Sequence, residues 1–155
     1  MTRDDRLSFV RAHRWAVVST VSPSGEPHSA VVRFVITDAF ELVFDTTDTT
    51  HKAADLRHNR KVAVVIGWDE NQTIQIEGLA DEPGGEELQH LKQIYSSRYP
   101  DYYRTRQAAK GLIYFRVRPR RVRYSDFRQN PANVITLDLV TGEESRAFVS
   151  FRGDA

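Results

Sequence analysis

The sequence predicts a mainly β fold with some α structure, in which six antiparallel strands with short connecting helices form a small closed or split β-barrel. Two observations support this prediction. Segments rich in β-branched residues recur along the chain, and polar turns at residues 22–27 and 69–72 join neighbouring segments into hairpins. The helices that we predict lie at the start of the chain and in the connections between strands.

The first part of the chain is expected to form a short helix followed by a meander. Residues 4–13 make the helix, with Leu7 and Val10 facing inward. The three strands of the meander are residues 15–21, 28–37 and 40–45. A second short helix over residues 51–58 ends near Asn59.

The second part adds three strands, at residues 61–68, 73–81 and 112–124. Apolar residues at helical spacing predict one further helix that ends by Pro100, and these are Leu88, Leu91, Ile94 and Tyr95. Arginine alternates with apolar residues along the last strand, which indicates one solvated face rather than a stripe that binds nucleic acid. Residues 1–128 thus form the barrel domain, and residues 129–155 a C-terminal extension that contains one hairpin signal.

Composition excludes several classes of protein. The chain of 155 residues is one domain by length, and its 40% apolar and 28% charged residues are typical of soluble globular proteins. A net charge of +1 gives no global field that favours nucleic acid or a membrane surface. The absence of cysteine excludes disulfides, thiolate metal sites and cysteine nucleophiles. Because the sequence has no apolar signal core and no apolar run of membrane length, we expect a cytoplasmic protein.

Known catalytic motifs do not occur in the chain. It contains no Gly-x-Ser-x-Gly, no Walker A motif and no dinucleotide-binding glycine motif, so serine hydrolase, P-loop ATPase and Rossmann functions are excluded. His51 and His58 share a helix face, but no third ligand has a suitable spacing. Solvated histidines are therefore a better interpretation than a metal site, and we expect no metal.

The most informative segment follows the third strand. Asp45 is followed by a run of threonines, and a helix then begins at His51 and Lys52. Hydroxyl groups, a lysine and the free N–H groups of a helix N-terminus together suit an oxyanion such as a phosphate. The alternative is an ordinary helix start, in which Thr49 or Thr50 caps the first turn.

The layout of the chain resembles the pyridoxamine 5'-phosphate oxidase-like, FMN-binding split-barrel family. Five segments over residues 7–126 occur in the order of that family: residues 15–27, 31–35, 42–52, 74–80 and 114–124. The resemblance implies a six-stranded antiparallel split β-barrel, a homodimer with FMN (flavin mononucleotide) at the subunit interface, and a flavin-dependent oxidoreductase acting on an unidentified small molecule.

The resemblance also implies the residues that bind the cofactor. Thr50, His51 and Lys52 would hold the 5'-phosphate. Backbone groups of the second strand would meet the edge of the isoalloxazine ring, at Val32, Arg33, Phe34 and Val35. Asp45 and Thr46 would lie beside the ring, and Thr73 or Gln75 would reach its pyrimidine oxygens. Arg33 interrupts an apolar run. Its side chain either contacts the ligand or is exposed on the surface, and the sequence favours neither alternative.

The chain departs from the vitamin B6 oxidase that founded the family. An arginine of its phosphate site corresponds to Ala30, and a lysine that contacts its substrate corresponds to Val35. Its Arg-Leu-His-Asp-Arg signature has no counterpart in residues 127–138, and an aromatic residue after its last strand is replaced by Ser125. We therefore expect a flavin protein that is not a vitamin B6 oxidase.

Two other functions remain open. A reductase of the same fold could bind an 8-hydroxy-deazaflavin, whose longer phosphate-linked tail suits a groove with many arginines. Alternatively, the barrel could be a non-catalytic module that binds flavin or haem. In either flavin enzyme the cofactor carries the chemistry, so we expect no essential acid–base side chain and assign no catalytic residue.

Overall fold

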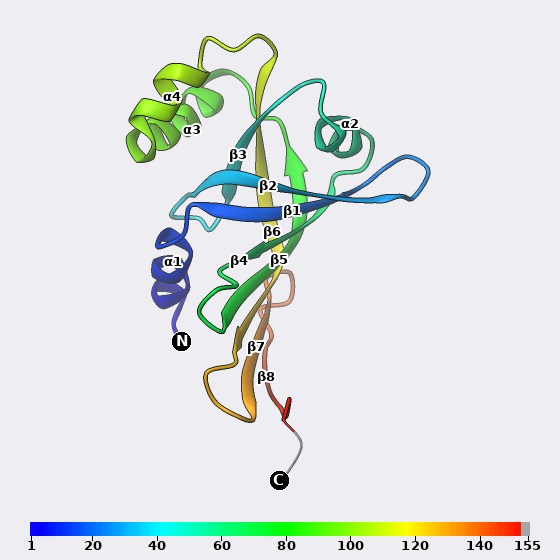
Figure 1. Cartoon of the computed structure of the whole chain (residues 1–155), viewed down its shortest axis with the longest axis vertical. Helices are drawn as coiled ribbons and strands as arrows, with labels where there is room; N and C mark the ends of the chain where they lie inside the picture. Colours follow the sequence, from blue (N-terminus) through cyan, green and yellow to red (C-terminus); the bar gives the residue numbers. More distant parts are fainter. Residues whose placement is uncertain (153–155) are drawn as a thin grey trace.

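The computed structural model describes residues 1–152, and within this range the chain forms four helices and eight strands (Figure 1). The helices are α1 (Arg3–Arg11), α2 (His51–His58), α3 (Gly85–Arg98) and α4 (Pro100–Arg106). The strands are β1 (Trp15–Val21), β2 (Pro27–Ile36), β3 (Leu42–Thr47), β4 (Lys61–Ile66), β5 (Gln72–Asp81), β6 (Leu112–Asp126), β7 (Ala132–Asp138) and β8 (Glu144–Val149). Residues 153–155, the end of the predicted extension, lie outside the described residues.

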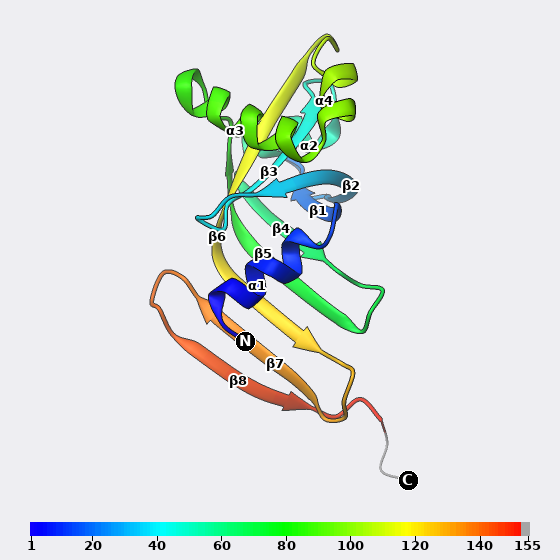
Figure 2. The same ribbon diagram turned by 90° about the vertical axis from the view of Figure 1, so that its left-hand side faces the viewer.

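Six of the strands form a closed antiparallel barrel, which confirms the predicted fold class. Hydrogen-bonded neighbours follow the order β3-β2-β1-β4-β5-β6, and β3 also pairs with β6, so the sheet closes on itself. β7 pairs with the far part of β6, and β8 pairs with β7. The hairpin of β7 and β8 extends away from the barrel (Figure 2).

Part of β2 extends beyond the closed barrel and has a strand partner on one side only. This strand pairs with β1 over residues 27–33, but with β3 only over residues 34–36. Beyond that point β3 continues beside β6, where Thr46 lies opposite Ile113. On its other side, the backbone of residues 27–33 has no strand partner within the described chain. We call this stretch the open edge of β2.

Side chains of β2 and β3 alternate between two packing layers, as expected for strands with a period of two. Val32, Phe34 and Phe44 point into the barrel and belong to its main core. On the outer face, Val35 and Val43 pack in a second cluster beneath α3 and α4. Its other buried members are Leu91, Tyr95, Tyr99 and Tyr114. The helices α3 and α4 therefore cover the outer face of β2 and β3, away from α2 (Figure 1).

The third strand differs from its predicted bounds at both ends. It begins at Leu42 rather than at residue 40, because Phe40 has a φ of 63° and its N–H donates to the carbonyl of Thr37 in a tight turn. It continues to Thr47 because β6 pairs with it as far as Leu112. The hydroxyl-rich run thus begins within the strand itself.

Other bounds differ at glycine and proline residues. The fourth strand ends at Ile66 instead of Trp68, because Gly67 adopts a φ of 70° and an added Cβ there would lie 2.6 Å from the ring of Phe9. The helix predicted to end by Pro100 ends at Arg98, and Pro100 then begins a further helix, α4, that the sequence pattern missed. Proline is favoured at the first helical position because its missing N–H has no helical partner there.

The first helix is one residue longer at its start than predicted and ends at Arg11 instead of residue 13. Thr2 caps it, because its side chain accepts from the N–H of Asp5 while the Asp5 carboxylate accepts from the N–H of Thr2. Among residues 1–152, no helix is long and apolar enough to cross a lipid bilayer.

Candidate functional site

The threonine-rich segment after β3 forms a capped helix start. Thr50 is the N-cap of α2: its hydroxyl oxygen accepts from the N–H of Ala53 at 3.3 Å and donates to the carbonyl of Thr47 at 3.0 Å. The hydroxyl of Thr46 lies 3.0 Å from that of Thr50. The N–H groups of His51 and Lys52 belong to the first turn and have no acceptor within the helix. They are the donors that this segment leaves for a ligand.

A hollow of about 500 Å³ lies between this helix start and the first two strands. We call it the α2 hollow. The predicted phosphate-site residues Thr50, His51 and Lys52 form one wall, and residues 27–30 of β2 form another. Val18 and Thr20 of β1 complete it. The structure therefore brings all three predicted residues together, opposite the start of the open edge of β2.

A buried carboxylate lies behind this hollow and holds a histidine. Asp55, whose side chain is only 3% exposed, accepts from the hydroxyl of Thr20 at 2.8 Å and from Nδ1 of His28 at 2.6 Å. Burial opposes the ionised form of Asp55. The hydrogen bonds from His28 and Thr20, with the fields of His28 and His51, outweigh burial and lower its pKa. Asp55 is therefore a carboxylate at neutral pH.

The imidazole of His28 lines the α2 hollow beside a second imidazole. The rings of His28 and His51 lie edge to face with their centroids 4.9 Å apart. The sequence analysis missed His28 and Asp55, which lie 27 residues apart and meet only across β2 and α2. The available signal was that His28 and Ala30 alternate onto one side of a strand, and that Asp55 follows His51 by one helical turn.

Lys52 is partly withdrawn from solvent. Burial lowers the pKa of its ammonium group, the carboxylate of Asp45 acts in the opposite direction, and the guanidinium of Arg106 lowers the pKa further. A partly desolvated ammonium group is stabilised by a bound anion more strongly than an exposed one, because less water competes for the charge. Arg106, from the unpredicted helix α4, is thus a positive charge close enough to act on Lys52, although it does not line the hollow.

Asp45 faces the opposite layer from the α2 hollow. Its side chain is 2% exposed and accepts from the hydroxyl of Tyr95 at 2.7 Å, from that of Tyr102 at 3.3 Å and from Nε of Arg106 at 3.2 Å. Burial together with this carboxylate raises the pKa of Tyr95 far above its ordinary value. Asp45 therefore joins α3 and α4 to β3, and its carboxylate is fully occupied by protein donors.

Arg33 lies on the same outer layer as Asp45. The carbon centre of its guanidinium group is 4.4 Å from the ring centroid of Tyr102, 4.7 Å from that of Trp15 and 5.0 Å from that of Tyr99. Its Nε is buried and has no hydrogen-bond partner among the described residues. Half-buried between aromatic rings, Arg33 matches neither a freely exposed side chain nor a residue of the α2 hollow.

The remaining predicted residues are distributed over several positions. The side chains of Val32 and Phe34 fill the barrel core, and that of Val35 is buried under α3. Gln75 lines a separate hollow of about 450 Å³ with Arg121 and Arg123 of β6. Thr73 lies opposite Ser125 on the same pair of strands. Within one chain, neither Thr73 nor Gln75 lines the α2 hollow.

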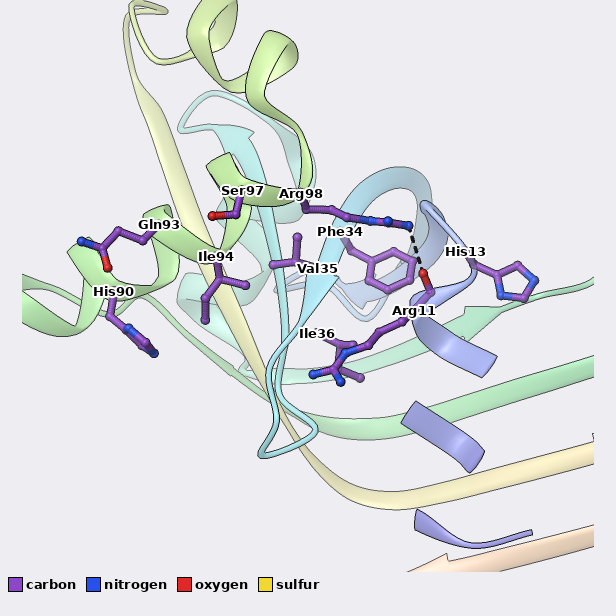
Figure 3. Close-up of a pocket in the computed structure, with 10 residues that line it drawn as sticks. All are labelled: Arg11, His13, Phe34, Val35, Ile36, His90, Gln93, Ile94, Ser97 and Arg98. Atoms are coloured by element: carbon purple, nitrogen blue, oxygen red, sulfur yellow. Dashed lines mark hydrogen bonds between the residues drawn. The ribbon is translucent and has the colours of Figure 1, made fainter. Parts of the chain in front are cut away.

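Another cavity of about 500 Å³ lies between α1, β2 and α3 (Figure 3). Its wall combines apolar side chains such as Ile36 and Ile94 with the basic side chains of Arg11 and Arg98. One Nη of Arg98 donates to the carbonyl of Arg11 at 2.9 Å, so this bond ties α3 to the end of α1. Within residues 1–152, its wall contains two of the predicted site residues, Phe34 and Val35.

The sequence and the fold were compared with known proteins. The family model for pyridoxamine 5'-phosphate oxidase matches residues 3–126. The chain belongs to the pyridoxamine 5'-phosphate oxidase-like family. This confirms the resemblance drawn from the five ordered segments. No curated protein matches the sequence.

Several solved structures share this family fold. A conserved hypothetical protein of Mycobacterium tuberculosis superposes with a TM-score of 0.68 at 24% identity, over 83% of this chain and 86% of that one. An FMN-binding protein of Nostoc punctiforme, related to pyridoxamine 5'-phosphate oxidase, gives a TM-score of 0.68 at 16% identity, over 95% and 94%. The haem storage protein HutZ of Vibrio cholerae gives 0.68 at 15% identity, over 76% and 89%. At these identities the likeness concerns the fold.

Proposed function

We propose that this protein binds FMN and acts as an oxidoreductase on a small molecule, with the phosphate of FMN in the α2 hollow. The observation that carries the proposal is the convergence of Lys52, His51 and the first turn of α2 on a hollow beside the open edge of β2. The likeness to an FMN-binding protein of the same fold supports the choice of cofactor.

The donors of the α2 hollow suit a phosphate group. The free N–H groups of the first helical turn and the ammonium group of Lys52 carry positive charge toward one space. A hydrogen bond between a charged lysine and a phosphate contributes about 1.5–3 kcal/mol. The hydroxyl of Thr50 already bonds within the cap, so we assign it a supporting role.

The open edge of β2 provides the groups for the flavin ring. The hydroxyl of Tyr95, which donates to Asp45, also lies 3.3 Å from the carbonyl of Arg33. The hydroxyl of Tyr99, the residue directly after α3, donates to the carbonyl of Phe34. Side chains of α3 and of the residue that follows it therefore cover this part of the strand. The backbone before Arg33 has no strand partner on this side, which supports a contact with the edge of the ring at this part of the strand.

The bound flavin would supply the transfer of a hydride or of electrons, and the protein would supply position. Lys52 and His51 fix the phosphate end, and the rigid barrel strand fixes the ring. Asp45 is committed to Tyr95, Tyr102 and Arg106 and is not available as a proton donor or acceptor. We therefore expect no essential acid–base residue.

A homodimer is part of the proposal. Trp15 is 47% exposed and Val31 is 61% exposed, on neighbouring strands of the outer barrel face. Exposed apolar side chains of this size favour burial against a partner. A second subunit could then bring Gln75, Arg121 and Arg123, which are separate from the α2 hollow in one chain, to the same cofactor. A monomer in light scattering that binds FMN at full affinity would contradict this part.

The test of the proposal compares FMN with riboflavin. Binding of each to the purified protein is measured by quenching of flavin fluorescence, and the mass of any co-purifying cofactor is determined. We expect tighter binding of FMN, because only FMN carries the phosphate. Equal affinities for FMN and riboflavin would contradict the phosphate site. A deazaflavin that co-purifies with the protein would show that the cofactor is a deazaflavin instead of FMN. Turnover with a reduced nicotinamide cofactor separates an enzyme from a binding module.

The substrate is expected to differ from that of the vitamin B6 oxidase. The side chain of Val35 is apolar and buried, so it cannot contact a substrate phosphate as the corresponding lysine does in that enzyme. Purified protein loaded with FMN should therefore form no appreciable pyridoxal 5'-phosphate from pyridoxine 5'-phosphate. Rapid formation of that product, lost on removal of FMN, would contradict this expectation.

A second candidate function is haem binding without catalysis. The likeness to HutZ, a haem storage protein, and the imidazoles of His28 and His51 in the α2 hollow favour it. A titration with haem distinguishes the two functions. A Soret band that shifts on binding, with the shift lost in a His28→Ala variant, would support haem binding. Displacement of FMN by haem without such a shift would not support it.

A further inference from the structure

The α2 hollow contains an imidazole that is held from behind. Thr20 and His28 both donate to the same oxygen of Asp55, and Asp55 is almost fully buried. Because Nδ1 of His28 is occupied by this carboxylate, Nε2 is the ring nitrogen available to a molecule in the hollow. The side chain of His28 is 34% exposed and lines the hollow.

The protonation of His28 decides what it can bind. A neutral ring that donates from Nδ1 to a carboxylate carries a lone pair on Nε2, which repels an oxyanion. A protonated ring donates from both nitrogens and can bridge the carboxylate and the oxyanion. An anion that enters the hollow therefore favours the protonated form.

We propose that His28 is a proton-linked anion contact of the α2 hollow: it takes up a proton when an oxyanion binds beside Lys52, and bridges that oxyanion to Asp55. The inference rests on the proposed function, because FMN would supply the oxyanion as its phosphate. His28 thereby provides a second positive group in a hollow where Ala30 occupies the position of the arginine of the vitamin B6 oxidase. Ala30 lies two residues further along the same strand and lines the same hollow.

Among residues 1–152, the titratable groups that contact His28 or line its hollow come from α2. Asp55 contacts its Nδ1, His51 packs against its ring, and Lys52 lines the same hollow. The neighbours from β1 and β2 that line the hollow are uncharged: Val18, Thr20, Pro27, Ser29 and Ala30. A bound phosphate adds negative charge beside the ring and therefore favours the form that donates from both nitrogens, which couples binding to proton uptake.

The direction of the pH dependence follows from this coupling. Proton uptake on binding means that the affinity for the oxyanion is greater at low pH and falls as the pH rises. The second ionisation of the phosphate itself acts in the opposite direction, because more of the dianion forms at higher pH. The contribution of His28 is therefore the difference between the protein and a variant without this imidazole.

The experiment measures the affinity for FMN divided by that for riboflavin, at about pH 6 and about pH 8. From about pH 6 to about pH 8, we expect this ratio to fall more in the unaltered protein than in a His28→Gln variant. The two changes should differ by up to about tenfold. His58→Gln is the matched control, because His58 ends the same helix, is exposed and does not line the hollow. It should behave as the unaltered protein does. His51→Gln tests whether the neighbouring imidazole carries the effect instead.

A second measurement reports the proton directly. The ring proton resonances of His28, identified by their absence in His28→Gln, are titrated by NMR with and without FMN and with inorganic phosphate. We expect the titration of His28 to move to higher pH when either is bound. Thr20→Val removes one donor to Asp55 but keeps the imidazole, so it should preserve this response.

The outcomes separate the two proposals. If FMN is preferred over riboflavin through Lys52, but His28→Gln has the same pH dependence as the unaltered protein, the inference is wrong and the FMN site stands. If His28 responds to inorganic phosphate but FMN is not preferred over riboflavin, the anion contact stands and the proposed cofactor is wrong. If His28 responds to neither ligand, the inference is wrong in any case.

Discussion

Two buried aspartates, Asp45 and Asp55, form similar hydrogen-bond networks but have different roles. Asp45 of β3 accepts from three side chains of α3 and α4, and Asp55 of α2 accepts from Thr20 and His28. Both carboxylates are almost fully buried and both are satisfied by hydrogen bonds. They lie in opposite packing layers, since Asp45 faces the α3–α4 cover and Asp55 the α2 hollow.

The difference lies in what each network leaves free. The donors to Asp45 are two phenols and a guanidinium group that complete a covered layer, so this network stabilises the fold. One donor to Asp55 is an imidazole with a second nitrogen at the wall of a hollow. A buried carboxylate stabilises the fold where all its hydrogen-bond donors are covered by other side chains. It can also support ligand binding where one donor has a second polar atom that faces a hollow.

The largest expected effect concerns the α3–α4 cover. Asp45→Ala should lower the free energy of unfolding by about 3 kcal/mol, because it removes the buried carboxylate that accepts from Tyr95, Tyr102 and Arg106. Urea unfolding followed by circular dichroism measures it. Asp101→Ala on the exposed part of α4 is the control and should change stability by less than about 0.5 kcal/mol. Similar losses from both variants would show that the network has no special role.

A smaller effect is expected on the binding side. Lys52→Ala should weaken FMN binding about tenfold, or about 1.4 kcal/mol, because one charged contact to the phosphate is lost. Its effect on riboflavin binding should be slight. Lys61→Ala, an exposed lysine at the start of β4, serves as the control for net charge. Equal weakening of FMN and riboflavin would place Lys52 outside the phosphate site.

Arg33 tests whether the aromatic layer is structural. Arg33→Ala should lower the free energy of unfolding by about 1 kcal/mol, because the guanidinium stacks on the rings of Tyr102, Trp15 and Tyr99. FMN affinity should change little, since Arg33 does not line the α2 hollow. Unchanged stability with a marked change in the flavin spectrum would instead place the guanidinium at the cofactor.

Acid should weaken the Asp55 network. The pKa of Asp55 is lowered in the folded protein, so its hydrogen bonds contribute stability above the ordinary pKa of an aspartate. That contribution is lost as pH falls through the lowered value. The difference in melting temperature between the unaltered protein and Asp55→Asn should therefore shrink as the pH is reduced below about 4. A difference that stays constant on acidification would contradict the ionised state of Asp55.

Much of the architecture could be predicted because it depends on local patterns. Alternating β-branched residues and short polar turns fix the six strands, and the threonine run before His51 fixes the start of α2. Where prediction was wrong, a single residue decided the outcome. Phe40 takes a left-handed turn in place of a strand start, and Pro100 begins a helix that it was expected only to end.

The site was predictable only in part, for a physical reason. Thr50, His51 and Lys52 are consecutive, so their convergence follows from one helix start. The side chains of Arg33, Val35 and Asp45 lie in the α3–α4 layer because side chains alternate along their strands. Their predicted contacts with a ligand stay predictions. Which face of a strand meets a helix and which meets a hollow depends on how distant elements pack.

The sequence by itself determined the six barrel strands, the start of α2 and the family, since each depends on residues close together or in a fixed order along the chain. The tertiary structure alone decided that His28 meets Asp55, 27 residues away, and that Tyr95 and Arg106 reach Asp45 from helices that follow it by 50 residues and more. Hydrogen bonds between distant side chains form only after the barrel closes. Their partners are therefore set by the packing of the strands and helices and leave no periodic signal in the sequence.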